Sequence, residues 1–321
     1  MKILRHYRDC PADAKGAVVA LGNFDGVHLG HRALLLEARR LARELKRPFG
    51  VIVFEPNPRE FFRPKDEPFR LTPFRAKARL LAELEVDLLI VLTFDAAMAS
   101  MSAQDFVFDI LVKELAVTHV VIGKDFRFGK GRSGDAAVLG YMGEMEGFGT
   151  TVFSPVIADG SVKISSSDIR SALEAGRPDE AARLLGHWWR VEGHVGQGEK
   201  RGSGFGFPTA NLKLEHTLLP AFGIYAVRTH LPDGRVFDGA ASFGLRPTFA
   251  LESPLLEVHL FGFSGDLYGA LIAVEFIAWL RPEKKFDTID ALKAQIAADC
   301  DEAKRILALA PRVPGLAAAT P

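Results

Sequence analysis

Two histidines three residues apart, His28 and His31, are the residues of this chain best suited to chemistry on a phosphate ester. They stand in the stretch GNFDGVHLGHR, where Gly22, Gly26 and Gly30 open the backbone. Residues at i and i+3 share one helix face, so both imidazoles can point at one ligand. Glycines and a positive helix N-terminus let a phosphate approach the main chain. The spacing predicts a nucleotide-handling site whose histidines bind an α-phosphate.

The elements on either side of these histidines must place them. Residues 17–21 (AVVAL) predict a short buried strand, and the apolar spacing over residues 34–42 predicts a helix. A histidine at a helix start can also be a simple cap, and the spacing alone leaves that alternative open. Further strand-like runs at 50–54, 88–94 and 119–123 alternate with amphipathic runs up to about residue 185. This alternation predicts a parallel α/β sheet that binds ligands at the carboxyl ends of its strands.

The second half of the chain has a different pattern of apolar and glycine residues. From Trp189 onward, glycine-punctuated β-rich runs predict an antiparallel barrel or sandwich, and an apolar face over residues 289–309 predicts a closing helix. The face includes Ile289, and residues 311–321 are expected to form a disordered tail. A length of 321 residues with 48% hydrophobic side chains favours two domains with packed cores.

Charge and cysteine content exclude some classes of protein. The chain has 40 Lys and Arg against 40 Asp and Glu, so bulk charge predicts neither a nucleic-acid partner nor a membrane partner. Two cysteines, Cys10 and Cys300, cannot build a disulfide scaffold or a cysteine-cluster metal site. With no export signal or long apolar run, these features predict a cytoplasmic protein. The sequence makes no prediction of oligomeric state.

Two other motifs carry polar groups suited to phosphates and a metal ion. Hydroxyls and a guanidinium crowd into ISSSDIR (residues 164–170), which could hold a polyphosphate or could simply cap a helix. In FPTANL, Thr209 and Asn211 lie on one strand face at i and i+2, and their oxygens suit a hard cation such as Mg²⁺. A glycine-rich stretch with Lys200 and Arg201 precedes them and contains no Walker GKS or GKT.

Taken in order, these motifs resemble the bacterial bifunctional riboflavin kinase/FMN adenylyltransferase (FAD synthetase) family. GNFDGVHLGH resembles its GxFDGxHxGH signature, ISSSDIR its ISSTxIR loop, and FPTANL its kinase signature, while SFGLRPTF and LEVHLFGFSGDLYG match later kinase motifs. The resemblance implies an α/β N-terminal nucleotidyltransferase domain with a Rossmann-like parallel sheet, and a C-terminal six-stranded antiparallel β-barrel kinase domain with a closing helix. The implied boundaries are 1–185, 186–310 and a tail at 311–321.

The resemblance also implies two reactions and their site residues. Riboflavin and ATP would give FMN and ADP, and FMN and ATP would then give FAD and pyrophosphate, with Mg²⁺ or another divalent ion on Thr209 and Asn211. The catalytic residues implied are His28, His31, Arg170 and Glu257, the last as base for the riboflavin hydroxyl. The ATP- and phosphate-binding residues implied are Gly22, Phe24, Asp25, Gly30, Ser165, Ser166, Gly198, Lys200, Arg201, Gly202 and Gly206. The flavin-binding residues implied are Asn57, Phe62, Asp125, Phe126, Phe128 and Arg281.

The chain departs from the family pattern at a few positions. Asn57 stands where His is usual, Asp125 where Asn is common, and Ser203 where Arg often occurs. Asn57 keeps a hydrogen bond but cannot become positively charged, so adenylylation would be slower or differently tuned. Alternatives are a monofunctional riboflavin kinase with a degenerate N-terminal domain, a different HxGH nucleotidyltransferase, and a flavin-binding regulator without turnover; FPTANL argues against the second.

Overall fold

The computed structural model describes residues 1–8, 10–154, 157–158, 162–196, 207–245 and 254–312. The chain forms two compact units. The first comprises Met1–Glu67 and Thr72–Ser165, and the second comprises Pro68–Leu71 and Ser166–Pro321. A four-residue segment from the first quarter of the sequence therefore folds with the later unit.

The first unit is built on a parallel sheet of six strands in its described residues, in the order β1-β4-β3-β2-β5-β6. The strands are β1 (Lys2–Leu4), β2 (Val18–Leu21), β3 (Phe49–Glu55), β4 (Leu88–Thr93), β5 (His119–Gly123) and β6 (Gly149–Phe153). Every pairing along this order is parallel, which confirms the predicted α/β class. Neither edge strand, β1 or β6, was among the predicted strands.

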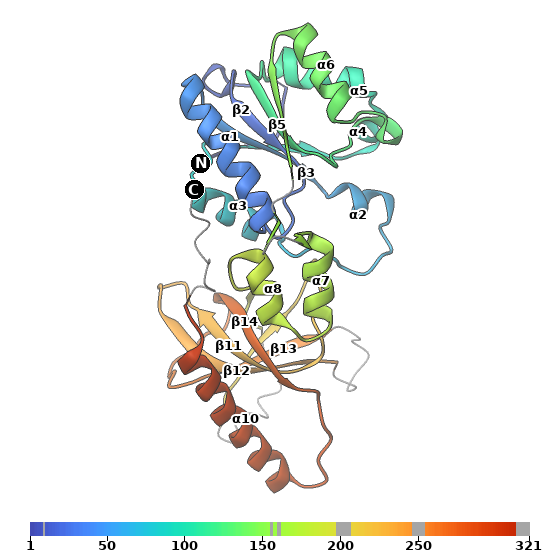
Figure 1. Cartoon of the computed structure of the whole chain (residues 1–321). Helices are drawn as coiled ribbons and strands as arrows, with labels where there is room; N and C mark the ends of the chain where they lie inside the picture. Colours follow the sequence, from blue (N-terminus) through green and yellow to red (C-terminus); the bar gives the residue numbers. More distant parts are fainter. Residues whose placement is uncertain (9, 155–156, 159–161, 197–206, 246–253, 313–321) are drawn as a thin grey trace. The chain divides into compact units, whose positions relative to one another are not determined.

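Helices cover both faces of this sheet (Figure 1). On one face lie α1 (Leu29–Leu45) and α3 (Phe74–Glu83), and on the other lie α4 (Ala96–Ser100), α5 (Ala103–Asp105), the π-helix η2 (Phe106–Glu114) and α6 (Ala136–Glu146). Successive residues of β2 alternate between the two faces: Val18 and Ala20 join the core under α1, and Val19 and Leu21 join the opposite core. Burial on both faces explains the continuous apolar runs of the central strands.

Shorter elements complete the first unit. They are the 3₁₀ turns η1 (Ala12–Ala14) and η3 (Lys130–Arg132), the helix α2 (Pro58–Phe62) and the hairpin of β7 (Ile157–Ala158) with β8 (Val162–Lys163).

The second unit contains an antiparallel barrel whose described strands follow the order β10-β13-β12-β11-β14-β9. They are β9 (Arg190–His194), β10 (Ala210–Lys213), β11 (Gly223–His230), β12 (Val236–Gly244), β13 (Leu255–Leu260) and β14 (Leu271–Arg281). A bridge between Gly196 and Asn211 links the two ends of this order, so the barrel is nearly closed. The predicted six-stranded barrel is confirmed.

Two helices and the early segment complete the barrel core. Helices α7 (Ser166–Glu174) and α8 (Pro178–Leu185) pack with the barrel interior around the fully buried Trp189. Segment 68–71 is held by its carbonyl groups, since Trp189 Nε1 donates to Leu71 O at 2.9 Å and Thr217 Oγ1 donates to Arg70 O at 3.0 Å. Both helices pack in the later unit, although they precede residue 186, where the second domain was expected to begin.

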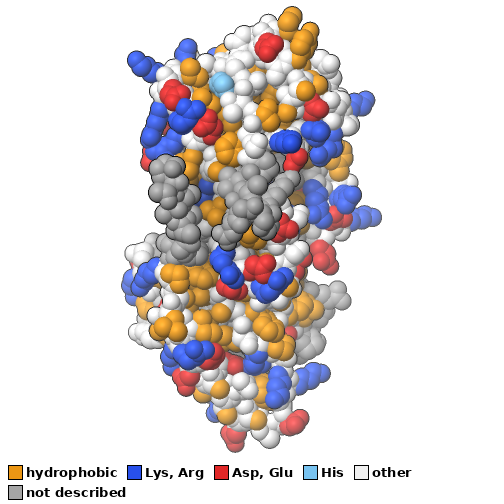
Figure 2. Space-filling view, in the orientation of Figure 1, with side chains coloured by type: hydrophobic (Ala, Val, Ile, Leu, Met, Phe, Trp, Pro, Cys, Tyr) orange, Lys and Arg blue, Asp and Glu red, His pale blue; other side chains and the backbone are white. Residues whose placement is uncertain are grey.

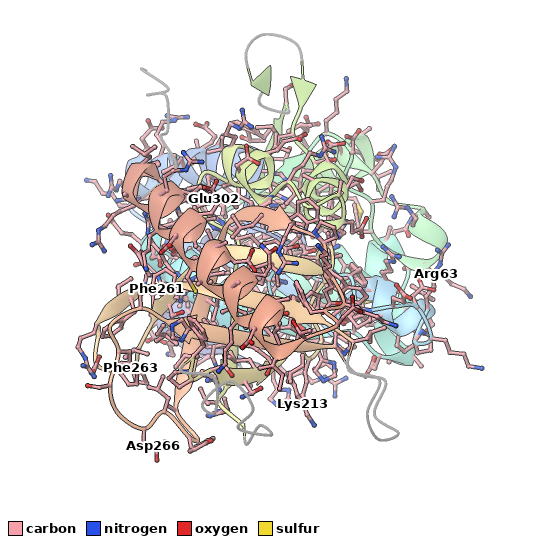
Figure 3. The ribbon with its side chains drawn as sticks, turned by 90° about the horizontal axis from the view of Figure 1, so that it is seen from below. Arg63, Lys213, Phe261, Phe263, Asp266 and Glu302 are labelled. Carbon is pink, nitrogen blue, oxygen red and sulfur yellow. The ribbon has the colours of Figure 1, made fainter. Side chains whose placement is uncertain are left out.

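Helix α10 (Ile289–Leu309) lies across the outside of the barrel strands (Figure 3). Cys300, Ala303 and Leu307 pack against residues of β11, β12 and β14. The helix has the predicted bounds, and of its predicted apolar face Ala303 and Leu307 are buried whereas Ile289 is 58% exposed.

A buried arginine, Arg228 of β11, receives the C-terminal end of α10. Its Nη2 donates to Leu307 O at 3.1 Å and to Ala310 O at 2.7 Å, and its Nη1 donates to Pro311 O at 2.7 Å. The last carbonyls of a helix have no partner within the helix and carry its negative dipole end. One guanidinium satisfies the Leu307 carbonyl of the last turn and the two carbonyls that follow the helix, and its positive charge neutralises that end.

Charged side chains of both signs are intermixed over the face shown in Figure 2, in keeping with the formal net charge of zero. Among the described residues, no helix has both the length and the apolarity needed to cross a bilayer.

Replacing Arg228 by Met should lower the free energy of unfolding by about 3 kcal/mol, because the carbonyl groups of Leu307 and Ala310 lose this donor and Asp238 loses its ion-pair partner Arg228. Urea unfolding followed by circular dichroism measures this change. Arg235→Met is the matched control: the Arg235 side chain is 58% exposed and pairs with Asp233, so its loss should change the free energy of unfolding much less. Equal losses in the two variants would contradict the capping role of Arg228.

Candidate active sites

The two histidines of the first motif lie at the point where β2 leads into α1. His28 is the N-cap of α1: its Nδ1 accepts a hydrogen bond from the His31 backbone N–H at 3.2 Å. The two rings are stacked, with centroids 3.6 Å apart and planes 16° from parallel. Because Nδ1 of His28 is an acceptor, neutral His28 carries its proton on Nε2, which is then a donor. The capping alternative is therefore correct, and it is compatible with a site.

The loop before the histidines has a strained backbone. Phe24 and Val27 have φ angles of 47° and 43°, in the left-handed region that residues other than glycine rarely adopt. Thr72 holds the loop in place: Thr72 N donates to Asp25 Oδ1 at 3.1 Å, and Gly26 N donates to Thr72 Oγ1 at 2.9 Å. The Asp25 side chain, predicted to bind phosphate, is buried against Thr72.

Two glycines of this motif leave room for close ring packing. A Cβ at Gly30 would lie 3.2 Å from the His28 ring, and one at Gly22 would lie 3.2 Å from the Phe24 ring. The Phe24 ring in turn meets the His31 ring edge-on, with centroids 5.3 Å apart. These contacts fix the positions of both imidazoles.

His31 lies in surroundings that favour its uncharged form. Its Nδ1 is buried and has no hydrogen-bond partner among the described residues. Burial, His28 and Lys77 together hold the pKa of His31 well below its usual value of 6.5. His31 is therefore neutral at neutral pH.

A cavity of about 850 Å³ opens beside this loop, with Asn23 of the loop in its wall. Phenylalanines from strand ends, helices and the following loop line much of it: Phe54, Phe62, Phe94, Phe106, Phe126 and Phe128. Four arginines also line it: Arg59, Arg63, Arg127 and Arg132. Such a space suits a flat aromatic ligand that carries negative charge.

The cavity contains most of the predicted flavin-binding residues of the first unit. Asn57, Phe62, Phe126 and Phe128 line it, whereas Asp125 is not among its lining residues. Asn57 also caps α2: its Oδ1 accepts from Arg59 N at 3.0 Å, and its own N–H donates to Glu60 at 3.1 Å. The four arginines were missed, because isolated arginines in a sequence look like surface charge.

The predicted polyphosphate loop lies at the division between the units. Ser165 is the last residue of the first unit, and Ser166 begins α7 in the second. Arg170 of α7 donates from Nε to Phe69 O at 2.8 Å, and its guanidinium lies 5.2 Å from the centre of the Phe69 ring.

In the second unit, Asn211, Glu257 and Ser242 form a row across three strands. Asn211 pairs with Glu257 between β10 and β13, and Glu257 pairs with Ser242 between β13 and β12. Directly paired residues of an antiparallel sheet lie on the same face. Their neighbours Leu256 and Val258 are fully buried in the barrel core, so this row lies on the outer face.

Asn211 offers an oxygen that the described residues do not satisfy. Its side chain is 7% exposed, and its Nδ2 donates to Thr209 O at 3.3 Å. Its Oδ1 is buried and accepts no hydrogen bond within the described part of the chain. A buried orphan oxygen two residues from a threonine hydroxyl and opposite a carboxylate fits a hard cation.

His259 supports the predicted metal-binding strand and was not singled out from the sequence. Its Nδ1 donates to Pro208 O at 2.9 Å, and its ring meets Phe207 edge-on. His259 lies two residues after Glu257 and so on the same face of β13. That period of two was the signal that could have identified it.

Other predicted residues of this unit lie elsewhere. Arg281, predicted to bind flavin, donates from Nε and Nη2 to Asp299 at 2.9 and 2.6 Å and so joins β14 to α10. The predicted phosphate-binding residues Gly198, Lys200, Arg201, Gly202 and Gly206 lie outside the described residues. Within the described residues, no three His, Cys, Asp or Glu side chains lie close enough together to hold a metal ion.

A parallel α/β unit with a capped HxxH pair, followed by an antiparallel barrel with a polar row on its outer face, defines a two-unit nucleotide-dependent transferase. Residues 10–168 match the family model described as FAD synthetase, and residues 185–307 match the one described as riboflavin kinase. The chain belongs to the bifunctional riboflavin kinase/FMN adenylyltransferase family. The predicted family, fold class and enzyme class are confirmed.

The relatives match this chain over nearly its whole length. The bifunctional riboflavin kinase/FMN adenylyltransferase of Haemophilus influenzae is 40% identical and aligns over 95% of this chain and 98% of its own. That of Escherichia coli K12 is 42% identical, over 93% and 96%. A crystal structure described as a macrolide-efflux protein from Streptococcus pneumoniae has a TM-score of 0.84 and 32% identity, and covers 95% of this chain and 98% of that one.

The lowered pKa of His31 makes folding stability depend on pH. Below pH 6.5 the unfolded chain gains a proton at His31 that the folded protein does not, so the free energy of unfolding should fall as the pH is lowered. Urea unfolding at about pH 7.5 and about pH 5.5 measures this slope. His31→Gln should flatten it, and replacing the exposed His6 by Gln should not. An unchanged slope in His31→Gln would refute a neutral, buried His31.

Proposed function

We propose that this chain phosphorylates riboflavin with ATP to give FMN, and then adenylylates FMN with a second ATP to give FAD and pyrophosphate. The observation that carries the proposal is the presence in one chain of two separate polar constellations, the capped His28–His31 pair and the Asn211–Glu257 row. Each lies in a unit that matches the corresponding enzyme family. Riboflavin, FMN and ATP are the proposed small-molecule partners.

In the kinase reaction, Glu257 is the proposed base. Phosphoryl transfer needs positioning, neutralisation of charge and an acceptor for the proton of the attacking hydroxyl. Glu257 would take the proton of the riboflavin 5′-hydroxyl, whose oxygen attacks the γ-phosphorus of ATP while ADP leaves. Thr209 and the orphan oxygen of Asn211 would hold Mg²⁺, which when bound neutralises charge on the transferring phosphate.

In the adenylyltransferase reaction, the histidine pair is the proposed source of hydrogen bonds. A phosphate oxygen of FMN attacks the α-phosphorus of ATP, and pyrophosphate leaves. His28 would donate from Nε2 to an α-phosphate oxygen as negative charge develops there. Ser165, Ser166 and Arg170 stay the proposed ligands of the leaving pyrophosphate on the strength of the motif.

The aromatic cavity beside the histidine loop is the proposed flavin site of the first unit. Its volume of about 850 Å³ and its phenylalanine walls suit a tricyclic ring, and its arginines suit the FMN phosphate. Cys10 and Cys300 are both unpaired and buried, which supports a reducing compartment such as the cytoplasm.

The proposal is tested by incubating the purified protein with riboflavin, excess ATP and Mg²⁺, and separating the three flavins over time. FMN followed by FAD is the expected result. FMN without FAD would favour the monofunctional kinase, and riboflavin binding without either product would favour a regulator.

Separate variants should divide the two reactions. His28→Ala should slow FAD formation on the order of a hundredfold, through loss of a hydrogen bond to developing charge, and leave FMN formation unchanged. Glu257→Gln should do the reverse, with FAD still formed from supplied FMN. Initial rates of the two half-reactions measure this, and equal losses of both in a folded variant would contradict two separate sites.

Phe62→Ala should raise the KM for FMN in adenylylation by about fivefold, because an aromatic contact in a binding site is worth about 1 kcal/mol. The Phe62 side chain is 63% exposed in the cavity wall, so its removal should not unfold the unit. Phe108→Ala is the control: Phe108 is 51% exposed and does not line the cavity. Pyrophosphate release at varied FMN gives the KM, and an unchanged value in Phe62→Ala would remove this wall from the flavin site.

A further inference from the structure

A buried lysine, Lys77 of α3, has no part in either proposed reaction. Its side chain is 2% exposed, and its Nζ lies 3.5 Å from Oε1 of Glu55, the last residue of β3. Lysine is among the residues least often fully buried, since moving an ammonium out of water costs several kcal/mol even when it is paired. Because burial of the Lys77 ammonium destabilises the fold, a role of this side chain in the site would account for it.

The position of Lys77 on α3 places it on the buried face of the helix. Thr72, two residues before α3 begins, holds Asp25 and Gly26 of the loop. One turn after Lys77, Leu80 and Leu81 pack in the same core as Phe24 and Val27. Residues three and four apart share a helix face, so Lys77 lies with Leu80 and Leu81 on the buried face of α3, which packs in the core that contains Phe24 and Val27.

We propose that Lys77 is a positioning residue of the adenylyltransferase site, whose buried ammonium, anchored by Glu55, keeps the stacked His28–His31 pair uncharged and hydrogen-bonded. The inference rests on the proposed function for its catalytic meaning. A proton on Nδ1 of His28 would remove the acceptor for His31 N–H and place a positive charge against the second ring. The positive charge of Lys77 opposes that protonation.

The effect of Lys77 on histidine protonation matters most when substrates are bound. The phosphates of ATP and FMN bring negative charge next to the histidines, and such charge favours protonated imidazole. A fixed positive charge on the protein side of the pair offsets that effect. His28 then keeps its Nε2 proton as a neutral hydrogen-bond donor with Nδ1 free of a proton.

The charged or titratable groups on the elements around His31 include His28 and Arg32 on either side of it, Asp25 in the loop and Glu55 at the end of β3, and α3 carries Arg75, Lys77 and Arg79. After burial, His28 and Lys77 are the groups that lower the pKa of His31, and Glu55 is not among the causes. Removing Glu55 therefore does not remove the influence of Lys77.

The test uses the full chain with ¹³C-labelled histidine and follows ring resonances by NMR as the pH is varied, with His31 assigned through His31→Gln. In Lys77→Met the pKa of His31 should rise toward its usual value, and FAD formation should fall severalfold below pH 6.5 relative to the unsubstituted protein. Lys77→Arg keeps the charge and should titrate as the unsubstituted protein does. FMN formation in the same samples reports on the fold of the rest of the chain.

Stranding Glu55 without its partner could itself unfold the first unit. The double variant Lys77→Met/Glu55→Met removes both members of the pair, a replacement that is often neutral or stabilising, and should show the same rise for His31. An unmoved His31 titration in either folded variant overturns the proposal. If the unsubstituted protein forms no FAD, the proposed function fails on its own, and the NMR titration still decides whether Lys77 acts on the pair.

Discussion

The hydrogen bond from the His31 backbone N–H to Nδ1 of His28 is the interaction on which the first site depends. It begins α1, fixes which nitrogen of His28 accepts, and brings the two rings into their stack. The elements around it maintain that bond: the left-handed residues Phe24 and Val27 turn the chain, and Thr72 clamps the turn. A single cap thus sets both the start of a helix and the protonation pattern of a site.

In the barrel, the register of the strands positions the polar side chains, as the helix cap does for the histidines of the first unit. Because side chains alternate along a strand, Leu256 and Val258 fill the barrel interior, and Glu257 between them lies on the outer face with Asn211. A slip of one residue in the pairing of β10 with β13 would place Leu212 or Ala210 opposite Glu257 on the outer face and turn Asn211 toward the apolar core. The packed core of the barrel and the polar row are therefore stabilised by the same register.

Local patterns in the sequence were enough to predict the central strands and the barrel, whereas the role expected of Glu257 came from the resemblance to the family. His28, Asn211 and Glu257 stand in motifs whose spacing matches the face they occupy. The short strands β1 and β6 were missed because three to five residues at a sheet edge carry little periodicity. Arg281 and Lys77 could not be placed, because their partners Asp299 and Glu55 lie 18 and 22 residues away and only the fold brings them together. The arginines of the aromatic cavity were missed for another reason, since isolated arginines in a sequence look like surface charge.

The early segment 68–71 also has a consequence for synthesis of the chain on the ribosome. Its carbonyl groups at Phe69, Arg70 and Leu71 accept from Arg170, Thr217 and Trp189, which follow them by 101, 147 and 118 residues. At translation rates of roughly 5 to 20 residues per second, these carbonyls wait roughly 5 to 30 s for their donors. During that interval water must hydrate these carbonyl groups. Segment 68–71 is therefore synthesised between two parts of the first unit but can pack only after the barrel residues have been made.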